Sequence, residues 1–232
     1  MAISSTQKNF ELITNNLINK IKNESKQIHR ILNANINNKK MFSKINFEHN
    51  TVVIEDLTEI MSINPIFYAI YFAHKDGSFF EIINMKEDSS LYNFYKADKL
   101  TRWTVIVNKD NKMQYTFLDE DKNILSKTII DKKYNPLQRP WYKYAISTDK
   151  PITTQPYNFS NIKTNGITFA RKMNLDGGVF AIDFTLRQLN NILALQTVEE
   201  NSEVFIFNSK GVKIASSNNF TDIFCCSVSS KF

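Results

Sequence analysis

The sequence has few of the residues that cross-link a chain or break its helices and strands. Among its 232 residues only two are cysteine, five are glycine and five are proline. The cysteines, Cys225 and Cys226, are neighbours, and adjacent cysteines cannot close a structural loop of useful size. A disulfide framework is therefore excluded. Stability has to come from a hydrophobic core, for which 42% apolar residues are ample.

Patterns of several common function classes are also missing. No window approaches the ~18 to 20 apolar residues of a membrane span, and the N-terminus lacks the apolar core of a signal peptide. The five glycines form no phosphate-binding loop, and no serine or cysteine lies in a nucleophile elbow. His29, His49 and His74 lie far apart, without metal-ligand spacing. We expect a soluble chain with no metal, no cofactor and no enzymatic activity.

Positive charge is present but dispersed. Lysine and arginine exceed aspartate and glutamate by 29 to 23, which gives a net charge of +6. The lysines are spread along the whole chain with acids between many of them, and this indicates a solvated surface. A basic nucleic-acid-binding module, which would gather these charges on one face with exposed aromatic rings, stays open as an alternative.

Hydrophobic periodicity predicts helices first and strands afterwards. Apolar residues spaced by three, four or seven predict a long amphipathic helix over about 6–37, and a second helix near 54–63 ends before Asn64-Pro65. A short helix over 141–147 is entered through Pro140, and Thr185 caps a helix over 185–196. Strands are predicted at 67–72, 79–83, 101–107, 113–118, 124–130, 167–173 and 179–184.

This order of elements lacks the parallel βαβ repeat. It predicts an α+β fold with a PAS-like plan, in which a five- or six-stranded antiparallel sheet carries packed helices and a long N-terminal helix. Strand-turn-strand patterns at 204–207 and 212–216 then repeat the opening of such a unit.

The candidate binding residues lie in one stretch and two later positions. The stretch is Tyr134-Asn135-Pro136-Leu137-Gln138-Arg139-Pro140-Trp141-Tyr142, and it is followed by Pro156-Tyr157 and by Asp183 at the end of the apolar run 179–182. An arginine can donate two parallel hydrogen bonds to a carboxylate, while aspartate and tyrosine oxygens accept hydrogen bonds from an ammonium. These are the groups that hold a small zwitterion, and none of them is a nucleophile beside a base.

Structural roles compete with binding at these positions. A salt bridge between Arg139 and Asp183 is the main alternative for the arginine. Asp183 shares a strand face with Val179 and Ala181 by alternation, but a helix-initiating carboxylate is a second interpretation, because a helix follows at once. Of the neighbours Trp141 and Tyr142, one ring is expected in the core and the other facing a cavity. Asn158, Ser160, Thr168, Arg102 and Tyr115 are further polar candidates near the pocket.

The motif Asn-Pro-x-x-Arg-Pro-Trp-Tyr, with the later Pro-Tyr step and the Gly-Val-x-x-x-Asp strand, resembles the membrane-distal module of bacterial double Cache (dCache) sensor domains. The resemblance covers roughly residues 8–216. In the amino-acid-binding subset it implies that Arg139 and Trp141 hold the ligand carboxylate, and that Tyr134, Tyr157 and Asp183 hold the ammonium. With Tyr142, these are the predicted ligand-binding residues.

The resemblance also implies how the chain is divided into domains and where its parent protein is located. We expect a long helix over 1–40, the ligand-binding Cache module over 41–197 and the start of an incomplete membrane-proximal module over 198–232. The parent protein would be a membrane-spanning receptor with this part on the periplasmic side, and the chain an excised piece of it. The N-terminal helix is a candidate homodimer contact. The output module stays open between a chemoreceptor, a kinase, a cyclase and a phosphodiesterase.

The ligand class has alternatives too. An organic acid or an amine would suit a sensor of the same fold, because the tyrosine and the aspartate are not confined to amino-acid binders. A PAS-like enzyme is the alternative from another class, although only Asp183 offers a base.

Overall fold

The computed structural model describes residues 2–42, 44–48, 50–159, 165–194, 203–207, 211 and 213–217. The chain divides into two compact units, one formed by 28–184 and the other by 1–27 together with 185–232. The domain boundaries expected near 40 and 197 stay predictions. Cys225, Cys226 and Ser160 lie outside the described residues, as does His49.

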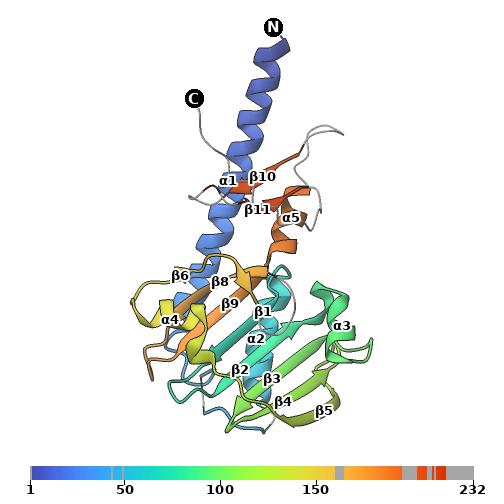
Figure 1. The fold of residues 1–232 in the computed structure, drawn as a ribbon, viewed down its shortest axis with the longest axis vertical. Helices are drawn as coiled ribbons and strands as arrows, with labels where there is room; N and C mark the ends of the chain where they lie inside the picture. The colour runs from blue at the N-terminus through green and yellow to red at the C-terminus, as the bar shows by residue number, and fades with distance from the viewer. Residues whose placement is uncertain are drawn as a thin grey trace. The chain divides into compact units, whose positions relative to one another are not determined.

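The unit 28–184 is built on one large sheet (Figure 1), in which every described strand pairing is antiparallel. The strands in spatial order are β5 (Ile124–Asp131), β4 (Lys112–Leu118), β3 (Trp103–Lys109), β2 (Phe79–Asn84), β1 (Ala69–Ala73), β9 (Val179–Thr185), β8 (Asn165–Lys172) and β6 (Ile152–Thr153), and β7 (Tyr157–Asn158) also pairs with β8. Chain neighbours lie side by side in the pairs β1/β2, β2/β3, β3/β4, β4/β5, β7/β8 and β8/β9. Between β5 and β6 the chain passes from one edge of the sheet to the other, and β9 lies beside β1.

The α+β fold with an antiparallel sheet is confirmed, but the expected number of strands was wrong. Over the residues that the structure describes, the sheet has nine strands instead of five or six. All seven predicted strands join it, and β6 and β7 add two residues each beside Pro151 and Pro156. Strands of two residues show no alternation, so the sequence pattern did not reveal them.

Short helical segments between β2 and β3, and before α4, were also missed. They are a 3₁₀ turn at Met85–Glu87, the helix α3 (Ser90–Tyr95) and a second 3₁₀ turn at Pro136–Gln138. Each is under two helical turns long, and an apolar period of 3.6 residues is not visible over so few positions.

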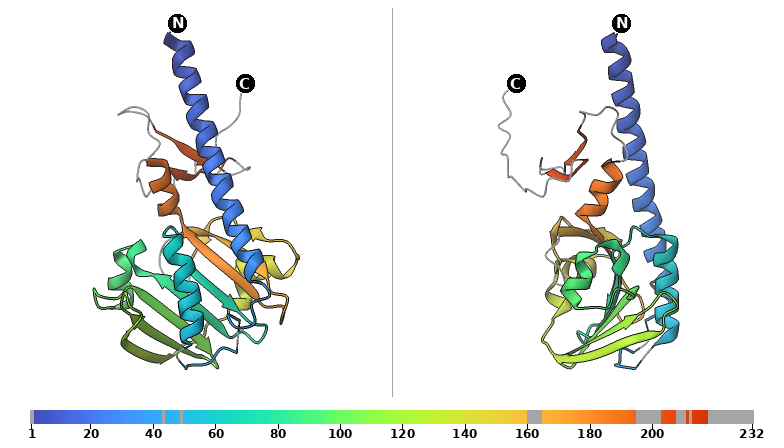
Figure 2. Two further views of the ribbon diagram at one scale, coloured as in Figure 1. Left: turned by 180° about the vertical axis from the view of Figure 1, so that it is seen from behind. Right: turned by 90° about the vertical axis from the view of Figure 1, so that its right-hand side faces the viewer.

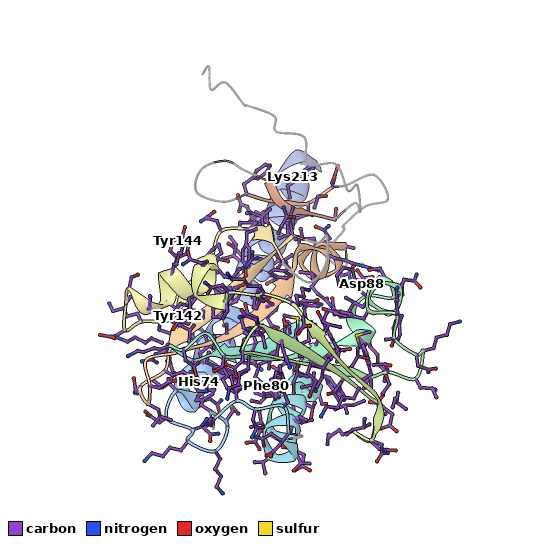
Figure 3. All side chains as sticks on the ribbon, turned by 60° about the horizontal axis from the view of Figure 1, so that its bottom comes forward. His74, Phe80, Asp88, Tyr142, Tyr144 and Lys213 are labelled. Atoms are coloured by element: carbon purple, nitrogen blue, oxygen red, sulfur yellow. The ribbon has the colours of Figure 1, made fainter. Side chains whose placement is uncertain are left out.

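Strand alternation gives the sheet two apolar faces. On the first, Ile70 and Phe72 of β1 pack with residues of α2 (Thr51–Ile63) and with Leu32 near the end of α1 (Ala2–Asn35). We call this the α2 face; α2 crosses it in Figure 2, and Phe80, labelled in Figure 3, belongs to it.

The opposite face, here the α4 face, carries α3 and α4 (Pro140–Ile146). Ala69 and Tyr71 of β1 point to this side and pack with Trp141 of α4 and Leu91 of α3. The central strands β1, β2 and β9 are therefore covered on both faces, whereas every residue of the edge strand β5 is exposed. Polar groups of the central strands on the α4 face are held between the sheet and its helices.

The other unit contains α5 (Leu186–Ala194) and a two-stranded antiparallel sheet of β10 (Phe205–Phe207) and β11 (Lys213–Ser216). The predicted cap of α5 is confirmed, because the hydroxyl of Thr185 accepts a hydrogen bond from the Gln188 N–H at 3.3 Å. Among its described residues, Leu193 and Ala215 form a small buried apolar cluster. None of the described helices has the length and apolar character that crossing a membrane requires.

Candidate functional site: a polar cleft on the α4 face

A cleft opens on the α4 face of the sheet and holds about 280 Å³ of empty space, counted with the solvent at its mouth. Strands β1, β2 and β9 form its floor, and the segment 134–141 with β7 forms its wall. The lining residues are Tyr68, Tyr71, Phe79, Glu81, Tyr134, Arg139, Trp141, Tyr157, Phe159 and Asp183. Five of the six predicted ligand-binding residues thus lie around one cleft.

The backbone around Arg139 is fixed by its neighbours. The Asn135 side chain accepts from the Leu137 N–H at 3.0 Å and starts the 3₁₀ turn, in which Pro136 takes an N-terminal position. Pro140 then begins α4, and the Arg139 carbonyl accepts the N–H groups of Tyr142 and Lys143 at 3.1 Å. Arg139 is therefore held in extended backbone between two short helices, with its side chain at the cleft.

Asp183 lies at the floor of the cleft and is 4% exposed. Its Oδ1 accepts hydrogen bonds from the Tyr71 hydroxyl at 2.7 Å and from the Thr168 hydroxyl at 2.5 Å. Burial raises the pKa of Asp183 from its ordinary value of 3.8 to about 7, against the smaller lowering effects of these two donors and of Arg139. Asp183 takes part in a hydrogen-bonded network on the α4 face, while the cap of α5 is Thr185.

Arg139 and Asp183 share the cleft without forming an ion pair with one another among the described salt bridges. The guanidinium instead donates to the Asn158 carbonyl at 2.9 Å and lies 5.4 Å from the centre of the Tyr157 ring. The structural salt bridge considered from sequence is therefore not present. A guanidinium and a carboxyl group therefore line one cleft without an ion pair between them.

The aromatic residues of the motif divide between the cleft and the core. Trp141 lines the cleft and packs edge-on against Tyr71, with ring centres 4.9 Å apart. Tyr157 places its hydroxyl 2.6 Å from that of Thr168, and Tyr134 contacts Phe79 at 5.1 Å.

Tyr142, shown in Figure 3, is buried on α4 and is not among the residues that line the cleft. Burial, followed by the charges of Asp176 and Asp76, raises its pKa. Its ring contacts Trp141 at 5.5 Å, which matches the expectation that one of the two neighbouring rings belongs to the core. A role in ligand binding stays a prediction for all six residues.

The structure also separates the weaker candidates. Thr168 joins the Asp183 network, and Asn158 meets Arg139 through its carbonyl. Arg102 instead donates to Asn84 and Glu120, and Tyr115 contacts Met113 through its hydroxyl, so neither lines the cleft. In the part of the chain that is described, no group of three or more His, Cys, Asp or Glu side chains is placed to hold a metal ion.

Sequence reasoning missed half of the cleft lining. Glu81 and Tyr71 are the missed polar residues on the floor, and Tyr68, Phe79 and Phe159 complete the set. A usable signal existed for Glu81, because it is a single charge inside the apolar run Phe79-Phe80-Glu81-Ile82-Ile83 of a central strand. Such a residue has to be paired or placed at a cavity.

The raised pKa of Asp183 predicts how stability depends on pH without ligand. The folded state binds this proton more tightly than the unfolded chain, so the contribution of Asp183 to the free energy of unfolding is largest below about pH 4. It is lost as pH rises toward 7. Relative to wild type, Asp183→Asn is expected to be equally stable near pH 4 and more stable at pH 8, by up to about 4 kcal/mol.

Urea unfolding of both proteins at pH 4, 6 and 8 checks this prediction. Asp121→Asn, in an exposed turn, is the matched control and should follow the wild-type profile at every pH. Parallel profiles for wild type and Asp183→Asn would show that folding does not raise the pKa of Asp183.

Comparisons with known proteins support the fold. The ligand-binding domain of the Campylobacter jejuni chemoreceptor Tlp3 in complex with L-valine superposes with a TM-score of 0.55 at 18% identity, covering 94% of this chain and 73% of that one. The chain has the fold of a chemoreceptor ligand-binding domain. The corresponding domain of the Pseudomonas fluorescens chemoreceptor CtaA in complex with L-serine gives a TM-score of 0.50 at 16% identity, over 86% of this chain and 66% of that one.

The sequence comparison adds a relative with a chemotaxis function. The methyl-accepting chemotaxis protein McpA of Bacillus subtilis is 29% identical over 113 residues, which are 47% of this chain. The matched part spans only 16% of the length of McpA. No protein-family model matches the chain. The chemoreceptor fold is thus supported by the superpositions, and the expected resemblance to Cache sensors agrees with it.

Proposed function

We propose that this chain is the ligand-binding part of a bacterial transmembrane chemoreceptor and that its cleft binds an α-amino acid. One observation carries the proposal: Arg139 and the buried Asp183 line the same cleft without pairing with one another. An α-amino acid presents a carboxylate and an ammonium a short distance apart. It therefore complements a guanidinium and a carboxylate that face one space.

The remaining groups of the cleft have roles in this arrangement. The ligand carboxylate meets Arg139, which Tyr157 supports from the side at 5.4 Å. The ammonium meets Asp183, whose Oδ1 is held by Tyr71 and Thr168. Trp141 and Phe79 form an apolar part of the cleft lining. Nothing among the lining residues forms a nucleophile and base pair, which supports a sensor over an enzyme.

The relatives support the same class of protein, a chemoreceptor ligand-binding domain. Two superposed chemoreceptor domains were solved with L-valine and L-serine, and McpA is a methyl-accepting chemotaxis protein. By this analogy the cleft lies on the extracytoplasmic side of a membrane-spanning parent. Signalling then proceeds by a population shift, in which ligand favours one of two arrangements of the parent receptor. A homodimer formed through α1 is part of this proposal.

A thermal-shift screen of L-amino acids, organic acids and simple amines tests the function. A ligand present at about 100 times its dissociation constant stabilises the folded state by ~2.7 kcal/mol. We expect stabilisation by one group of amino acids and little effect from organic acids or amines of the same size. Stabilisation only by acids without an amine would replace the amino-acid assignment with an organic-acid sensor.

A further inference from the structure

Thr168 is a buried residue that reaches the cleft only through its neighbours. It lies on β8, is 0% exposed and is not among the residues that line the cleft. Its backbone N–H donates to the Thr154 hydroxyl at 2.9 Å, and its carbonyl accepts from the Thr154 N–H at 2.9 Å. These two hydrogen bonds fix the position of Thr168, so its hydroxyl has a defined place beside the cleft.

The hydroxyl of Thr168 meets oxygens of three residues in the cleft lining. Its Oγ1 lies 2.5 Å from Oδ1 of Asp183, 2.6 Å from the Tyr157 hydroxyl and 3.3 Å from the Tyr71 hydroxyl. Tyr71 also donates to Oδ1 of Asp183 at 2.7 Å. A threonine hydroxyl carries one proton and two lone pairs, and an ionised carboxylate only accepts hydrogen bonds. The number of protons therefore fixes the direction of each bond in the network.

When Asp183 is ionised, the protons of Thr168 and Tyr71 both go to its Oδ1. The short contact between the hydroxyls of Tyr157 and Thr168 is then made by the proton of Tyr157. Tyr157 is left with oxygen lone pairs and no proton for a ligand. Oδ1 of Asp183 already accepts two hydrogen bonds, while Oδ2 accepts none from the described residues. Two acceptors thus remain for a ligand ammonium, Oδ2 of Asp183 and the oxygen of Tyr157.

We propose that Thr168 is a positioning residue for ammonium binding: its hydroxyl holds the carboxylate of Asp183 and turns the lone pairs of Tyr157 toward the ligand. This inference rests on the proposed function, because it takes the ligand ammonium to lie between Asp183 and Tyr157. Burial raises the pKa of Asp183, and the hydrogen bond from Thr168 is the largest of the effects that lower it. Thr168 therefore also favours the ionised carboxylate that an ammonium requires.

Thr168→Val replaces the hydroxyl with a methyl group of similar size and tests this role by calorimetry. The probes are the L-amino acid that stabilises wild type most in the thermal-shift screen and its deaminated acid, which for L-valine is 3-methylbutanoate. Affinity for the amino acid should fall by at least about 10-fold, the loss typical of one hydrogen bond to a charged group. Affinity for the deaminated acid should stay within a few-fold of wild type, because Arg139 is untouched. Thr168→Ser keeps the hydroxyl and should bind both probes as wild type does.

Thr104→Val is the matched control. Thr104 is also 0% exposed, lies on β3 and donates to the sulfur of Met85 at 3.0 Å, away from the cleft lining. This variant removes an equally buried hydroxyl and should leave the affinities for both probes unchanged.

The dependence of affinity on pH gives a readout that a loss of packing does not move. The affinity of wild type for the amino acid is expected to rise from about pH 6 to about pH 8, because Asp183, with a pKa of about 7, ionises there. In Thr168→Val this rise should move to higher pH, because a donor that lowers the pKa of Asp183 is gone. The other titratable groups that line the cleft are unchanged in this variant; they are Tyr68, Tyr71, Glu81, Tyr134, Arg139 and Tyr157.

The outcomes distinguish the inference from the function beneath it. Equal losses for the two probes in Thr168→Val, or an unchanged pH profile, would make Thr168 a structural residue only, and the amino-acid function would stand. Failure of wild type to bind any amino acid would refute both proposals. If circular dichroism shows that Thr168→Val is unfolded, Tyr157→Phe decides, because it keeps the ring beside Arg139 and removes the oxygen. A loss confined to the amino acid supports the inference, and no loss or equal losses overturn it.

Discussion

Arg139→Ala is expected to reduce the affinity for the bound amino acid by at least about 30-fold, and by more than 1,000-fold if its partner is fully desolvated. The guanidinium lines the cleft on extended backbone between two prolines and makes its one described hydrogen bond to the Asn158 carbonyl. Removing it leaves the ligand carboxylate desolvated without a cation. Isothermal titration calorimetry of the variant with the ligand found by the screen measures the loss.

Asp183→Ala is expected to reduce the affinity for the amino acid by a similar factor. Asp183→Asn separates the part of the site that binds the ammonium from the part that binds the carboxylate. The asparagine variant keeps Arg139 and should retain weak affinity for a carboxylate that lacks the amine, whereas Arg139→Ala should not. Arg171→Ala is the matched control, because Arg171 lies on β8 and donates to Asn33 of α1, away from the cleft lining. Full affinity of Arg139→Ala for the amino acid would remove Arg139 from the site.

Trp141→Ala is expected to destabilise the domain by about 3 to 5 kcal/mol, the range for deleting a buried tryptophan side chain. Trp141 is 2% exposed and contacts the rings of Tyr71, Phe79 and Tyr142 at 4.9, 6.4 and 5.5 Å. Its removal opens the wall of the cleft and loosens Tyr71, one of the two donors to Asp183. Urea unfolding gives the loss of stability, and calorimetry on the remaining folded protein gives the loss of affinity.

Tyr144→Ala provides the control on the same short helix. Tyr144 is 56% exposed and points outward from α4 in Figure 3, so its truncation should change stability by less than about 0.5 kcal/mol. Equal losses for Trp141→Ala and Tyr144→Ala would mean that the helix as a whole, and not the buried indole, determines the stability of this wall.

Local patterns were sufficient to predict most of the fold and one side of the site. Alternation along 179–184 placed Asp183 on the same face as Ala181, and the structure has it there. The short helix expected to be entered through Pro140 does begin at that residue. These features depend on neighbours within a few residues, so the sequence displays them directly.

The other side of the site depends on register between distant strands. Tyr71 reaches Asp183 across 112 positions of sequence, and the pairing of β1 with both β2 and β9 brings Glu81 into the same cleft. A single sequence does not specify which strand lies beside which. The rotation of α4 about its axis is a similar case. A helix of seven residues is too short for its apolar period to show whether Trp141 or Tyr142 faces the cleft.

The most direct test of the amino-acid site compares two ligands that differ only in the α-ammonium. Wild type is titrated by calorimetry with the amino acid that stabilises it most and with the matching acid lacking that group. We expect the deaminated acid to bind at least about 30-fold more weakly, because the buried Asp183 then faces no cation. Equal affinities would contradict the role of Asp183 and identify the cleft as a site for carboxylic acids.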